Sequence, residues 1–374
     1  MQLRELSSAG ILAGKRVLLR AELNVPVAGG KVFDEFRLLK SLETMRFLSK
    51  AGARTTIVAH LGREGGSLAP IAEILAQELP VAFVPEIAGE RARAAAREIA
   101  NGGFLLLENL RSDSREEKND PQFAKALASF GELFVQDAFG ASHRTHASIV
   151  GVPARLPSFA GLLLAKEVAE LSHALTPPSP SLLIIGGAKF ETKGPLIEKF
   201  LAVYDIVFVG GAIANDLFKA QGLAMGKSLI SSERYDFSNI LKNPKLMLPS
   251  DVVVEGGSAV TVKSPAQVLP HEGVYDVGPD TIAKLADVIQ SVKFILWNGP
   301  MGNYEHGFVK QTEALARAVA GSGAYSVVGG GDTVAAIAKL NLLERFGFVS
   351  TGGGAMLEFL EKGTLPGIEA LRAA

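Results

Sequence analysis

The sequence contains no cysteine among its 374 residues. Disulfides, thiolate catalysis and cysteine-based metal sites are therefore excluded. An excess of one charge is also lacking: 38 basic and 39 acidic residues leave a formal net charge of -1, so there is no overall basic field for nucleic acid. The amino terminus lacks the apolar segment of a signal peptide, and no apolar run is long enough to span a bilayer. A cytoplasmic protein without nucleic-acid or membrane partners is expected.

The composition that remains is typical of a folded globular protein, with 48% hydrophobic and 21% charged residues. The length of 374 residues predicts two domains. The chain has 40 glycines, and many of them form clusters that directly follow short aliphatic runs. These clusters are Gly186-Gly187, Gly210-Gly211, Gly329–Gly331 and Gly352–Gly354.

Short aliphatic or β-branched runs recur along the whole chain. They cover residues 16–20, 55–59, 81–84, 104–107 and 133–135 in the first half, and 182–185, 206–209, 246–248, 294–297 and 325–328 in the second. Runs this short and this apolar are typical of parallel strands that are buried on both faces. Helical patterns lie between them, for example over residues 37–51 and 312–319. We therefore predict an α/β fold with two doubly wound parallel sheets.

A proline-rich segment at residues 176–180 marks the expected domain boundary. Three prolines in five residues end a helix and stiffen a connector. The preceding residues, 163–175, have a helical pattern. We predict an N-terminal domain over residues 1–165, a connecting helix over 166–176 and a C-terminal domain over 177–359.

Basic and polar residues follow the strands of the first half. Because the carboxyl ends of parallel strands meet at one edge of a sheet, these side chains are expected to converge. They are Asn24, Arg37, His60, Arg63, Arg111, His143 and Arg144. Each arginine alone could serve a surface ion pair, but four planar forks at one edge favour a small, strongly anionic ligand. His143 is expected to bind the anion. His143 and His146 have no third metal ligand nearby, and His146 is expected to be structural.

Glycine clusters take the corresponding positions in the second half. Glycine lets a backbone approach a ligand closely, and a helix that begins at glycine presents N–H groups and a positive dipole end to phosphate. Lys189 and Lys193 lie four residues apart, so both ammonium groups are expected to reach one phosphate chain. An aspartate beside such a loop is a natural Mg²⁺ ligand. The candidates are Gly187, Lys189, Lys193, Gly211, Asn298, Glu305, Gly330, Gly331, Asp332 and Thr333.

Two standard nucleotide-binding motifs are absent. Without G-x-G-x-x-G, a nicotinamide-dependent oxidoreductase, which is one alternative function, lacks its fingerprint. Residues 222–228, GLAMGKS, look like a Walker A loop but have one residue too few between the glycines and no strand directly before them. We interpret this segment as a structural turn.

Nine segments resemble the signature blocks of phosphoglycerate kinases, in the order of that family and over about residues 15–371. They are KRVLLRAELNVP, HLGR, ENLR, EEKNDPQFAKALA, DAFGASHRTHAS, GGAKFETK, WNGPMGNYE, VVGGGDT and STGGGAMLEFLE. The resemblance implies two Rossmann-like domains that face a cleft and are joined by a helix, with residues of about 360–374 packing back on the first domain. It also implies reversible phosphoryl transfer between 1,3-bisphosphoglycerate and ADP, giving 3-phosphoglycerate and ATP, in a monomer that uses Mg²⁺.

The resemblance further implies a role for each candidate. Lys189 would contact the phosphoryl group in transfer, Glu305 the ribose hydroxyls and Asp332 the Mg²⁺ ion. The residues that would hold 3-phosphoglycerate are Asn24, Arg37, His60, Arg63, Arg111 and Arg144. Those that would contact the nucleotide phosphates or their surroundings are Lys193, Gly211, Asn298 and Thr333.

A carboxylate that accepts or gives up the phosphoryl group is already ionised, so the reaction needs no general base. The requirement is electrostatic, because two anions have to meet in line. We expect the charge to be neutralised by Arg37, Lys189, the helix N-terminus at Gly353 and Gly354, and Mg²⁺.

Several positions depart from the pattern of the family. Glu22 stands where the family has aspartate, and its extra methylene is expected to disturb a contact with the substrate hydroxyl more than the chemistry. The other departures are Thr192 for aspartate, Ala212 for glycine, Phe348 for histidine and Ser112-Asp113 for Phe-His. They leave one alternative open, a catalytically silent binding protein of the phosphoglycerate kinase type.

Overall fold

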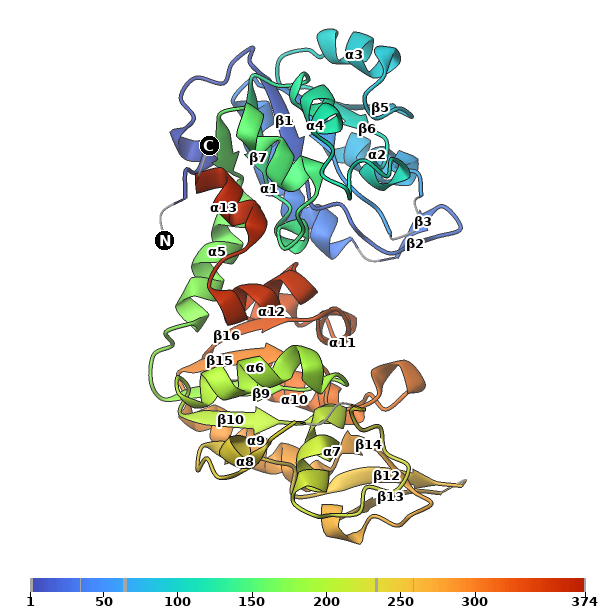
Figure 1. Cartoon of the computed structure of the whole chain (residues 1–374), viewed down its shortest axis with the longest axis vertical. Coiled ribbons are helices and arrows are strands. Elements are labelled where there is room, and N and C mark those ends of the chain that lie inside the picture. The colour runs from blue at the N-terminus through green and yellow to red at the C-terminus, as the bar shows by residue number, and fades with distance from the viewer. Residues whose placement is uncertain (1–2, 34, 63–65, 233–234, 258, 373–374) are drawn as a thin grey trace. The chain divides into compact units, whose positions relative to one another are not determined.

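The computed structural model describes residues 3–33, 35–62, 66–232, 235–257 and 259–372. The chain forms two compact units (Figure 1). The first contains Met1–Ala169 together with Thr364–Ala374, and the second contains Glu170–Gly363. The change from one unit to the other falls within helix α5 (Leu162–Ala174), at the position of the expected helix over residues 163–175.

The first unit is built around one sheet of six parallel strands, and a separate two-stranded hairpin, β2–β3, precedes α1. The strands are β1 (Arg16–Arg20), β2 (Val27–Ala28), β3 (Lys31–Val32), β4 (Arg54–Val58), β5 (Val81–Val84), β6 (Phe104–Leu107), β7 (Leu133–Gln136) and β8 (Ser158–Ala160). The helices besides α5 are α1 (Phe36–Lys50), α2 (Ala69–Glu78), α3 (Glu90–Arg97), α4 (Pro121–Ala128) and α13 (Pro366–Arg372). Short 3₁₀ or π turns are η1 (Leu6–Ser8), η2 (Leu110–Ser112), η3 (Phe139–Ala141), η4 (Ala147–Gly151) and η5 (Pro153–Arg155).

The six-stranded sheet of this unit has the order β5-β6-β4-β1-β7-β8. Val17, Leu18 and Leu19 of the central strand β1 are completely buried, because helices cover both faces of a doubly wound sheet. The chain moves from β1 toward β4 on one side and returns to β7 on the other. The carboxyl ends of β1 and β7 therefore lie side by side, with Arg20 opposite Gln136.

The C-terminal segment belongs to this unit although it is far away in sequence. α13, drawn in red among the blue and green elements, packs against η4 (Figure 1). The N–H of Gly367 donates to the carbonyl oxygen of Ser142 at 2.8 Å. A side chain at Gly367 would lie 2.9 Å from Ile149, so glycine permits this close approach.

The second unit has its own sheet of six parallel strands and a smaller antiparallel sheet. The strands are β9 (Ser181–Ile185), β10 (Ile206–Val209), β11 (Leu246–Met247), β12 (Val252–Gly256), β13 (Ala259–Lys263), β14 (Gly273–Val277), β15 (Phe294–Asn298), β16 (Tyr325–Gly329) and β17 (Phe348–Val349). The helices are α6 (Phe190–Leu201), α7 (Gly211–Ala220), α8 (Ser238–Leu241), α9 (Pro279–Ser291), α10 (Lys310–Ala320), α11 (Gly331–Lys339) and α12 (Gly353–Lys362). Short 3₁₀ turns are η6 (Pro265–Gln267), η7 (Tyr304–His306) and η8 (Leu343–Arg345).

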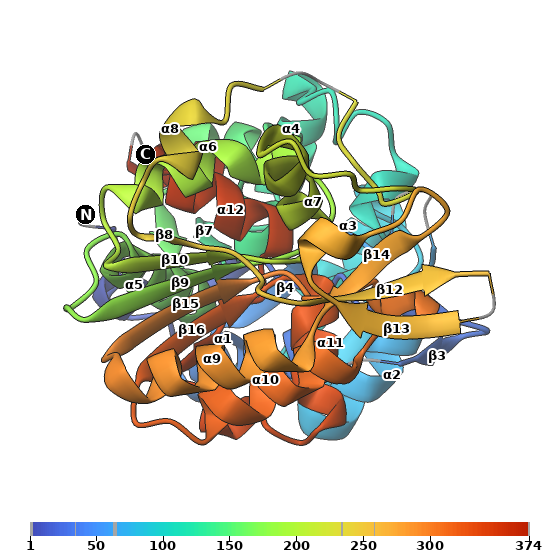
Figure 2. The same cartoon turned by 90° about the horizontal axis from the view of Figure 1, so that it is seen from below.

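The large sheet of the second unit has the order β11-β10-β9-β15-β16-β17. Figure 2 shows α6 and α12 on one face of this sheet and α9 and α10 on the other. The predicted α/β class with two Rossmann-like sheets is confirmed by these two six-stranded parallel sheets.

Four features of the strand pattern were missed by the sequence prediction. Two are the short edge strands β8 and β17, and the third is the hairpin β2–β3. The fourth is the antiparallel sheet of order β13-β12-β14. All residues of β13 except Lys263 are exposed, so this strand lacks the continuous apolar run from which the parallel strands were predicted.

Within the described ranges, no helix is both long and apolar enough to cross a membrane.

Candidate active site

The pocket of the second unit lies at the carboxyl ends of β9 and β15. From β9 the chain continues toward β10 and β11, and from β15 it continues the other way, toward β16 and β17. This is the switch point at which doubly wound sheets bind ligands. The N–H of Gly186 donates to the carbonyl oxygen of Asn298 at 3.0 Å, and that of Gly187 to Pro300 at 2.9 Å. These bonds join the loops after β9 and β15, and the joined backbone forms the floor of the pocket.

This floor depends on glycine at two positions. A Cβ atom at Gly186 would lie 2.2 Å from the carbonyl oxygen of Pro300, and one at Gly211 would lie 2.5 Å from the nitrogen of Gly187. Gly211 also has a φ of +62°, a backbone conformation that residues with a side chain rarely adopt. A larger residue at either position would push the loops apart.

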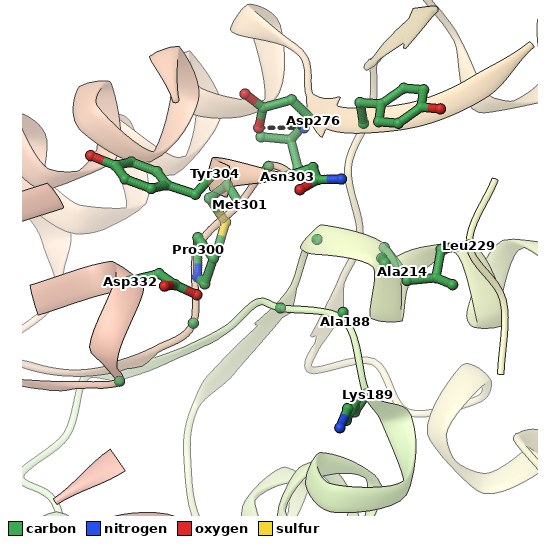
Figure 3. A pocket seen from close by; sticks show the side chains of 18 of the residues that line it. Ala188, Lys189, Ala214, Leu229, Asp276, Pro300, Met301, Asn303, Tyr304 and Asp332 are labelled. Carbon is green, nitrogen blue, oxygen red and sulfur yellow. Dashed lines mark hydrogen bonds between the residues drawn. The ribbon is translucent and has the colours of Figure 1, made fainter. Parts of the chain in front are cut away.

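The cavity above the floor has a volume of about 830 Å³ (Figure 3). Every candidate of the second half lines it, and so does the start of α12. The predicted residues on its wall are Gly187, Lys189, Lys193, Gly211, Asn298, Glu305, Gly330, Gly331, Asp332, Thr333, Gly353 and Gly354. The structure thus brings residues from 187 to 354 into one pocket, and their individual roles stay predictions.

The two lysines of this pocket are not equivalent. Lys189 is exposed and precedes the first residue of α6, whereas Lys193 is buried in the first turn of that helix. The ammonium group of Lys193 donates to the carbonyl oxygen of Gly186 at 2.5 Å. Burial lowers the pKa of Lys193 to about 8, against an opposing effect of the nearby Asp332. Lys189 is therefore the more accessible of the two, and Lys193 also fastens α6 to the loop after β9.

Asn298 and Thr333 lie in the floor of the pocket, and both side chains are buried. The hydroxyl of Thr333 accepts the N–H of Gly299 at 3.1 Å, which ties the loop after β15 to the start of α11. The amide nitrogen of Asn298 lies 3.7 Å from the sulfur of Met356 in α12. Both residues thus hold together the elements that form the wall.

Asp332 meets the requirements of a cation ligand. It lies in the first turn of α11, on the wall of the pocket. Partial desolvation and the negative charge of Glu305 raise the pKa of Asp332, while Lys193 opposes the increase. A carboxylate beside a second carboxylate is stabilised by a bound cation, and Mg²⁺ takes one or two carboxylates together with phosphate oxygens. The described residues contain no group of three or more His, Cys, Asp or Glu side chains that could hold a metal ion.

The N-terminus of α12 provides positive charge without a side chain. The helix begins at Gly353 after Gly352, and no side chain caps it. Gly353 and Gly354 both line the cavity. The positive end of the helix dipole therefore contributes to the wall, which suits a phosphate group.

A smaller pocket of about 650 Å³ lies at the edge of the sheet in the first unit. It is lined by Asn24, Arg37 and Gly62, among other residues. The amide oxygen of Asn24 accepts the N–H of Gly62 at 3.0 Å, and Arg37 donates to the carbonyl oxygen of Asn24 at 2.8 Å. These bonds connect the loops after β1 and β4. The predicted Arg63 lies outside the described residues.

Three further basic candidates, Arg111, His143 and Arg144, follow other strands of the same sheet and do not line this pocket. His60 follows β4 and is buried. Arg111, in η2 after β6, donates to the carbonyl oxygen of Gly62 at 2.5 Å and pairs with Glu117 at 3.6 Å. After β7, His143 is partly buried and Arg144 is exposed. Arg111 is therefore linked to the loop of the pocket, whereas His143 and Arg144 follow β7, the strand beside β1.

Glu22 is buried at the end of β1, only 2% exposed. Burial raises the pKa of Glu22, while Arg37, Arg20 and the N–H groups of Gly140 and Asn24 lower it. Its Oε2 atom has no hydrogen-bond partner among the described residues. The buried Oε2 atom is thus left without a protein partner, and the expected effect of the longer Glu22 side chain on a substrate contact stays a prediction.

His146 contacts protein groups, as its expected structural role requires. Its Nδ1 lies 4.0 Å from Oε1 of Glu116. Burial, and then the positive charge of Arg111, lower the pKa of His146 to about 4.

Residues 222–228 are irregular and contain two turns after α7, which agrees with the interpretation as a structural turn. Lys227 of this segment nevertheless lines the large cavity, and sequence reasoning missed it. The positions that depart from the family pattern are accommodated locally. Thr192 donates its hydroxyl to the carbonyl oxygen of Lys189 at 3.1 Å, and Phe348 is buried in β17.

Sequence reasoning also missed part of the large cavity. Asp276 of β14 lines it, and burial raises the pKa of this carboxyl to about 7, although the N–H groups of Gln311 and Val277 favour the charged form (Figure 3). An apolar wall is formed by Ala214, Phe218, Leu229, Val252 and Val274. Asp276 lies within β14, between Tyr275 and Val277, in a strand that the sequence did not predict, so no strand end pointed to it.

Comparisons with known proteins agree with this arrangement. The sequence profile of the family described as phosphoglycerate kinase matches residues 8–363. A phosphoglycerate kinase of Thermus thermophilus is 47% identical over 380 residues, which cover 96% of this chain and 97% of that protein. The cytosolic phosphoglycerate kinase of Triticum aestivum is 42% identical, with 97% of this chain and 96% of that protein covered.

Solved structures show the same likeness. That of phosphoglycerate kinase from Coxiella burnetii has a TM-score of 0.85 at 40% identity, covering 100% of this chain and 99% of the other. The enzyme from Pyrococcus horikoshii OT3 has a TM-score of 0.86 at 29% identity, covering 99% and 98%. The family profile and the relatives show that this chain belongs to the phosphoglycerate kinase family.

Proposed function

We propose that the first unit of this chain holds 3-phosphoglycerate or 1,3-bisphosphoglycerate, and that the second holds ADP or ATP, for the phosphoryl transfer of the family. The observation that carries the proposal is the single pocket at the switch point of the second sheet, which is lined by every predicted nucleotide residue. The chain is a phosphotransferase with a carboxyl group as acceptor.

The phosphoglycerate site is assigned to the basic edge of the first sheet. Arg37 lines a pocket there with Asn24, and Arg111 is linked to the same loop through Gly62. Arginine forks suit phosphate and carboxylate oxygens. Glu22 is included as the residue beside the substrate hydroxyl, and its longer side chain would disturb that contact. The full proposed set is Glu22, Asn24, Arg37, His60, Arg63, Arg111, His143 and Arg144.

The nucleotide site is assigned to the large cavity. Its glycine loops and the start of α12 suit the phosphates, and the apolar wall suits a purine base. Glu305, which also lines the cavity, would accept hydrogen bonds from the ribose. Asp332 would hold Mg²⁺ together with phosphate oxygens, and the bound ion would supply positive charge to those oxygens. The chain's own residues then have to orient the phosphates and exclude water.

Charge stabilisation is the main catalytic task, because the reacting carboxylate is ionised at neutral pH. Lys189 is an exposed cation that lines the cavity, and it directly precedes α6. With Arg37 and the α12 N-terminus at Gly353 and Gly354, it would neutralise the equatorial oxygens of the phosphoryl group in transfer.

The two ligands must come into contact for transfer, and water must be excluded from the acyl phosphate. We propose that the units change their relative placement when both ligands are bound. Small-angle scattering should show compaction with 3-phosphoglycerate and a non-hydrolysable ATP analogue together. An unchanged radius of gyration would refute this part. A cytoplasmic, monomeric enzyme remains our expectation, and the wheat relative is named cytosolic.

A coupled assay with ATP and 3-phosphoglycerate tests the function. Turnover that depends on both substrates and on Mg²⁺ is expected. Binding of both ligands without turnover would instead identify a silent binding protein, an alternative that the comparisons do not favour. A requirement for a nicotinamide cofactor would identify an oxidoreductase.

A further inference from the structure

A network of hydrogen-bonded, buried polar side chains lies in the first unit, beneath the basic edge of the sheet. Arg20, at the end of β1, is 1% exposed, and no carboxylate lies within ion-pair distance of it in the described part of the chain. Its Nε donates to the hydroxyl of Ser148 at 3.0 Å, and Nη1 donates to the carbonyl oxygen of Ala21 at 2.9 Å. Its Nη2 lies 2.9 Å from Nδ1 of His60.

At the end of this network opposite His60 lies the buried carboxylate of Glu116. The hydroxyl of Ser148 donates to Oε1 of Glu116 at 2.5 Å, and the N–H of Ser148 donates to Oε2 at 3.0 Å. Since the hydroxyl has a single proton, its donation to Glu116 leaves the oxygen as an acceptor for Arg20. The direction of every hydrogen bond from Glu116 to Arg20 is therefore determined, and the guanidinium has one orientation.

The orientation of Arg20 determines the tautomer of His60. A guanidinium carries only donors, so Nδ1 of His60 has to be the acceptor and cannot carry a proton. The ring proton then lies on Nε2. The titratable groups that act on this ring are all basic: the charged Arg20 from β1, Arg111 from η2 and Arg37 from α1, and His146 before η4, which adds positive charge only when it is protonated. With burial as the largest cause, they lower the pKa of His60 well below its usual value.

We propose that Arg20 is a positioning residue that keeps His60 as a neutral Nε2–H donor for an anionic oxygen of the phosphoglycerate substrate. This inference rests on the proposed function of the basic edge. The four arginines supply charge there, and His60 supplies one directed hydrogen bond instead of a further cation. Binding through His60 is then independent of pH across the range in which a free histidine titrates.

The state of His60 can be read directly in the wild-type protein by nitrogen-15 NMR of the histidine side chains. The chain has 6 histidines, and the signal lost in His60→Gln assigns the one of interest. We expect a protonated Nε2, an unprotonated Nδ1 and no titration between about pH 5.5 and 8. An Nδ1–H tautomer, or a titration midpoint near the ordinary value of about 6.5, would overturn the proposal.

Variants separate positioning from a general effect on the fold. In Arg20→Met we expect His60 to titrate, and the KM for 3-phosphoglycerate to rise about tenfold and to become pH-dependent, with the KM for ATP unchanged. Arg16→Met is the matched control, since Arg16 begins the same strand but is exposed and pairs with Glu132. If Arg20→Met does not fold, Ser148→Ala removes the acceptor of Nε and should shift the same two readouts in the same direction. A KM that stays constant with pH in the folded variant would contradict the proposed role.

The two levels of the proposal fail in different ways. If the chain binds 3-phosphoglycerate but shows no turnover, the kinase function fails, while the NMR result still decides the state of His60. If turnover is normal and His60 titrates, the positioning role fails alone.

Discussion

The two candidate ligand-binding regions differ in the groups that form them: side chains in the first unit and mainly backbone in the second. In the first unit the candidate site consists of side-chain charges, such as Arg37 and Arg111, whose guanidinium groups donate to the backbone of neighbouring loops. In the second unit it consists mainly of backbone, brought close by Gly186 and Gly211. A side-chain site can lose one group and keep its shape. A backbone site loses its shape when a single methyl group is added.

The backbone pocket has an exposed cation, Lys189, in the loop after β9, and its removal should have the largest effect on rate. We expect Lys189→Ala to lower kcat at least about a hundredfold, because it removes charge stabilisation that acts in the transition state. The measurement is steady-state kinetics with both substrates saturating. Lys284→Ala, an exposed lysine of α9, is the control and should leave kcat unchanged. A loss of less than about tenfold in Lys189→Ala would remove this residue from the transfer step.

The glycine floor can be tested by a pair of substitutions that share backbone strain but differ in crowding. Gly211 and Gly222 both have positive φ, at +62° and +87°. A Cβ atom at Gly211 would meet the nitrogen of Gly187, whereas nothing lies within 4 Å at Gly222. We expect Gly211→Ala to weaken ADP binding by more than about tenfold, and Gly222→Ala to have little effect on it.

Isothermal titration calorimetry with ADP and with 3-phosphoglycerate measures this pair. Affinity for 3-phosphoglycerate should be unchanged in both variants. Equal ADP affinities in Gly211→Ala and Gly222→Ala would show that the close approach of the loops is not required.

A substitution in the side-chain site should affect 3-phosphoglycerate and leave the nucleotide unaffected. Arg37→Met is expected to lower kcat/KM for 3-phosphoglycerate by about tenfold to a hundredfold, because charge-assisted hydrogen bonds contribute roughly 1.5–3 kcal/mol. The KM for ATP should not change. Lys40→Met on the exposed face of the same helix is the matched control. A comparable increase of the KM for ATP in Arg37→Met would remove the division of labour between the two regions.

The smallest effect concerns Asp276 at the wall of the large cavity, whose pKa burial raises from 3.8 to about 7. The folded protein holds this proton more tightly than the unfolded chain does. Its contribution to stability is therefore full below about pH 4 and is lost as the pH rises through 7. As the pH rises from about 4 to above 7, the unfolding free energy of Asp276→Asn should therefore increase relative to that of the wild type, by on the order of 1–3 kcal/mol.

Urea unfolding at several pH values measures this difference. Asp287→Asn, at an exposed position of α9, is the control and should keep a constant difference from the wild type. A constant difference for Asp276→Asn as well would show that its carboxyl group titrates normally in the folded protein.

The large sheets could be predicted from the sequence for a physical reason. Strands buried on both faces, such as Phe104–Leu107 and residues 294–297 of β15, have to be apolar throughout, so they stand out as runs. Ala259–Lys263 forms an exposed edge strand with mixed side chains and gave no such signal. β8 and β17 have three and two residues, too few to show a period.

The candidate site was predictable where chemistry follows a strand directly. Lys189, Asp332 and Gly353 come just after apolar runs, and the topology brings them to one edge. Arg20 could not be recognised in this way. It is part of the strand Arg16–Arg20, and its partner Ser148 lies 128 residues away. A burial that depends on such a distant contact leaves no local pattern in the sequence.

Ligand-induced chemical-shift changes in the isotope-labelled protein test the central division most directly. We predict that 3-phosphoglycerate shifts amide signals of residues at the basic edge, such as Asn24, Gly62 and Arg111, and that ADP with Mg²⁺ shifts those of Gly187, Gly211 and Asp332. Each ligand added alone should leave the other set unchanged. Shifts of the glycine loops by 3-phosphoglycerate alone, or of the arginine cluster by ADP alone, would contradict the assignment of one ligand to each unit.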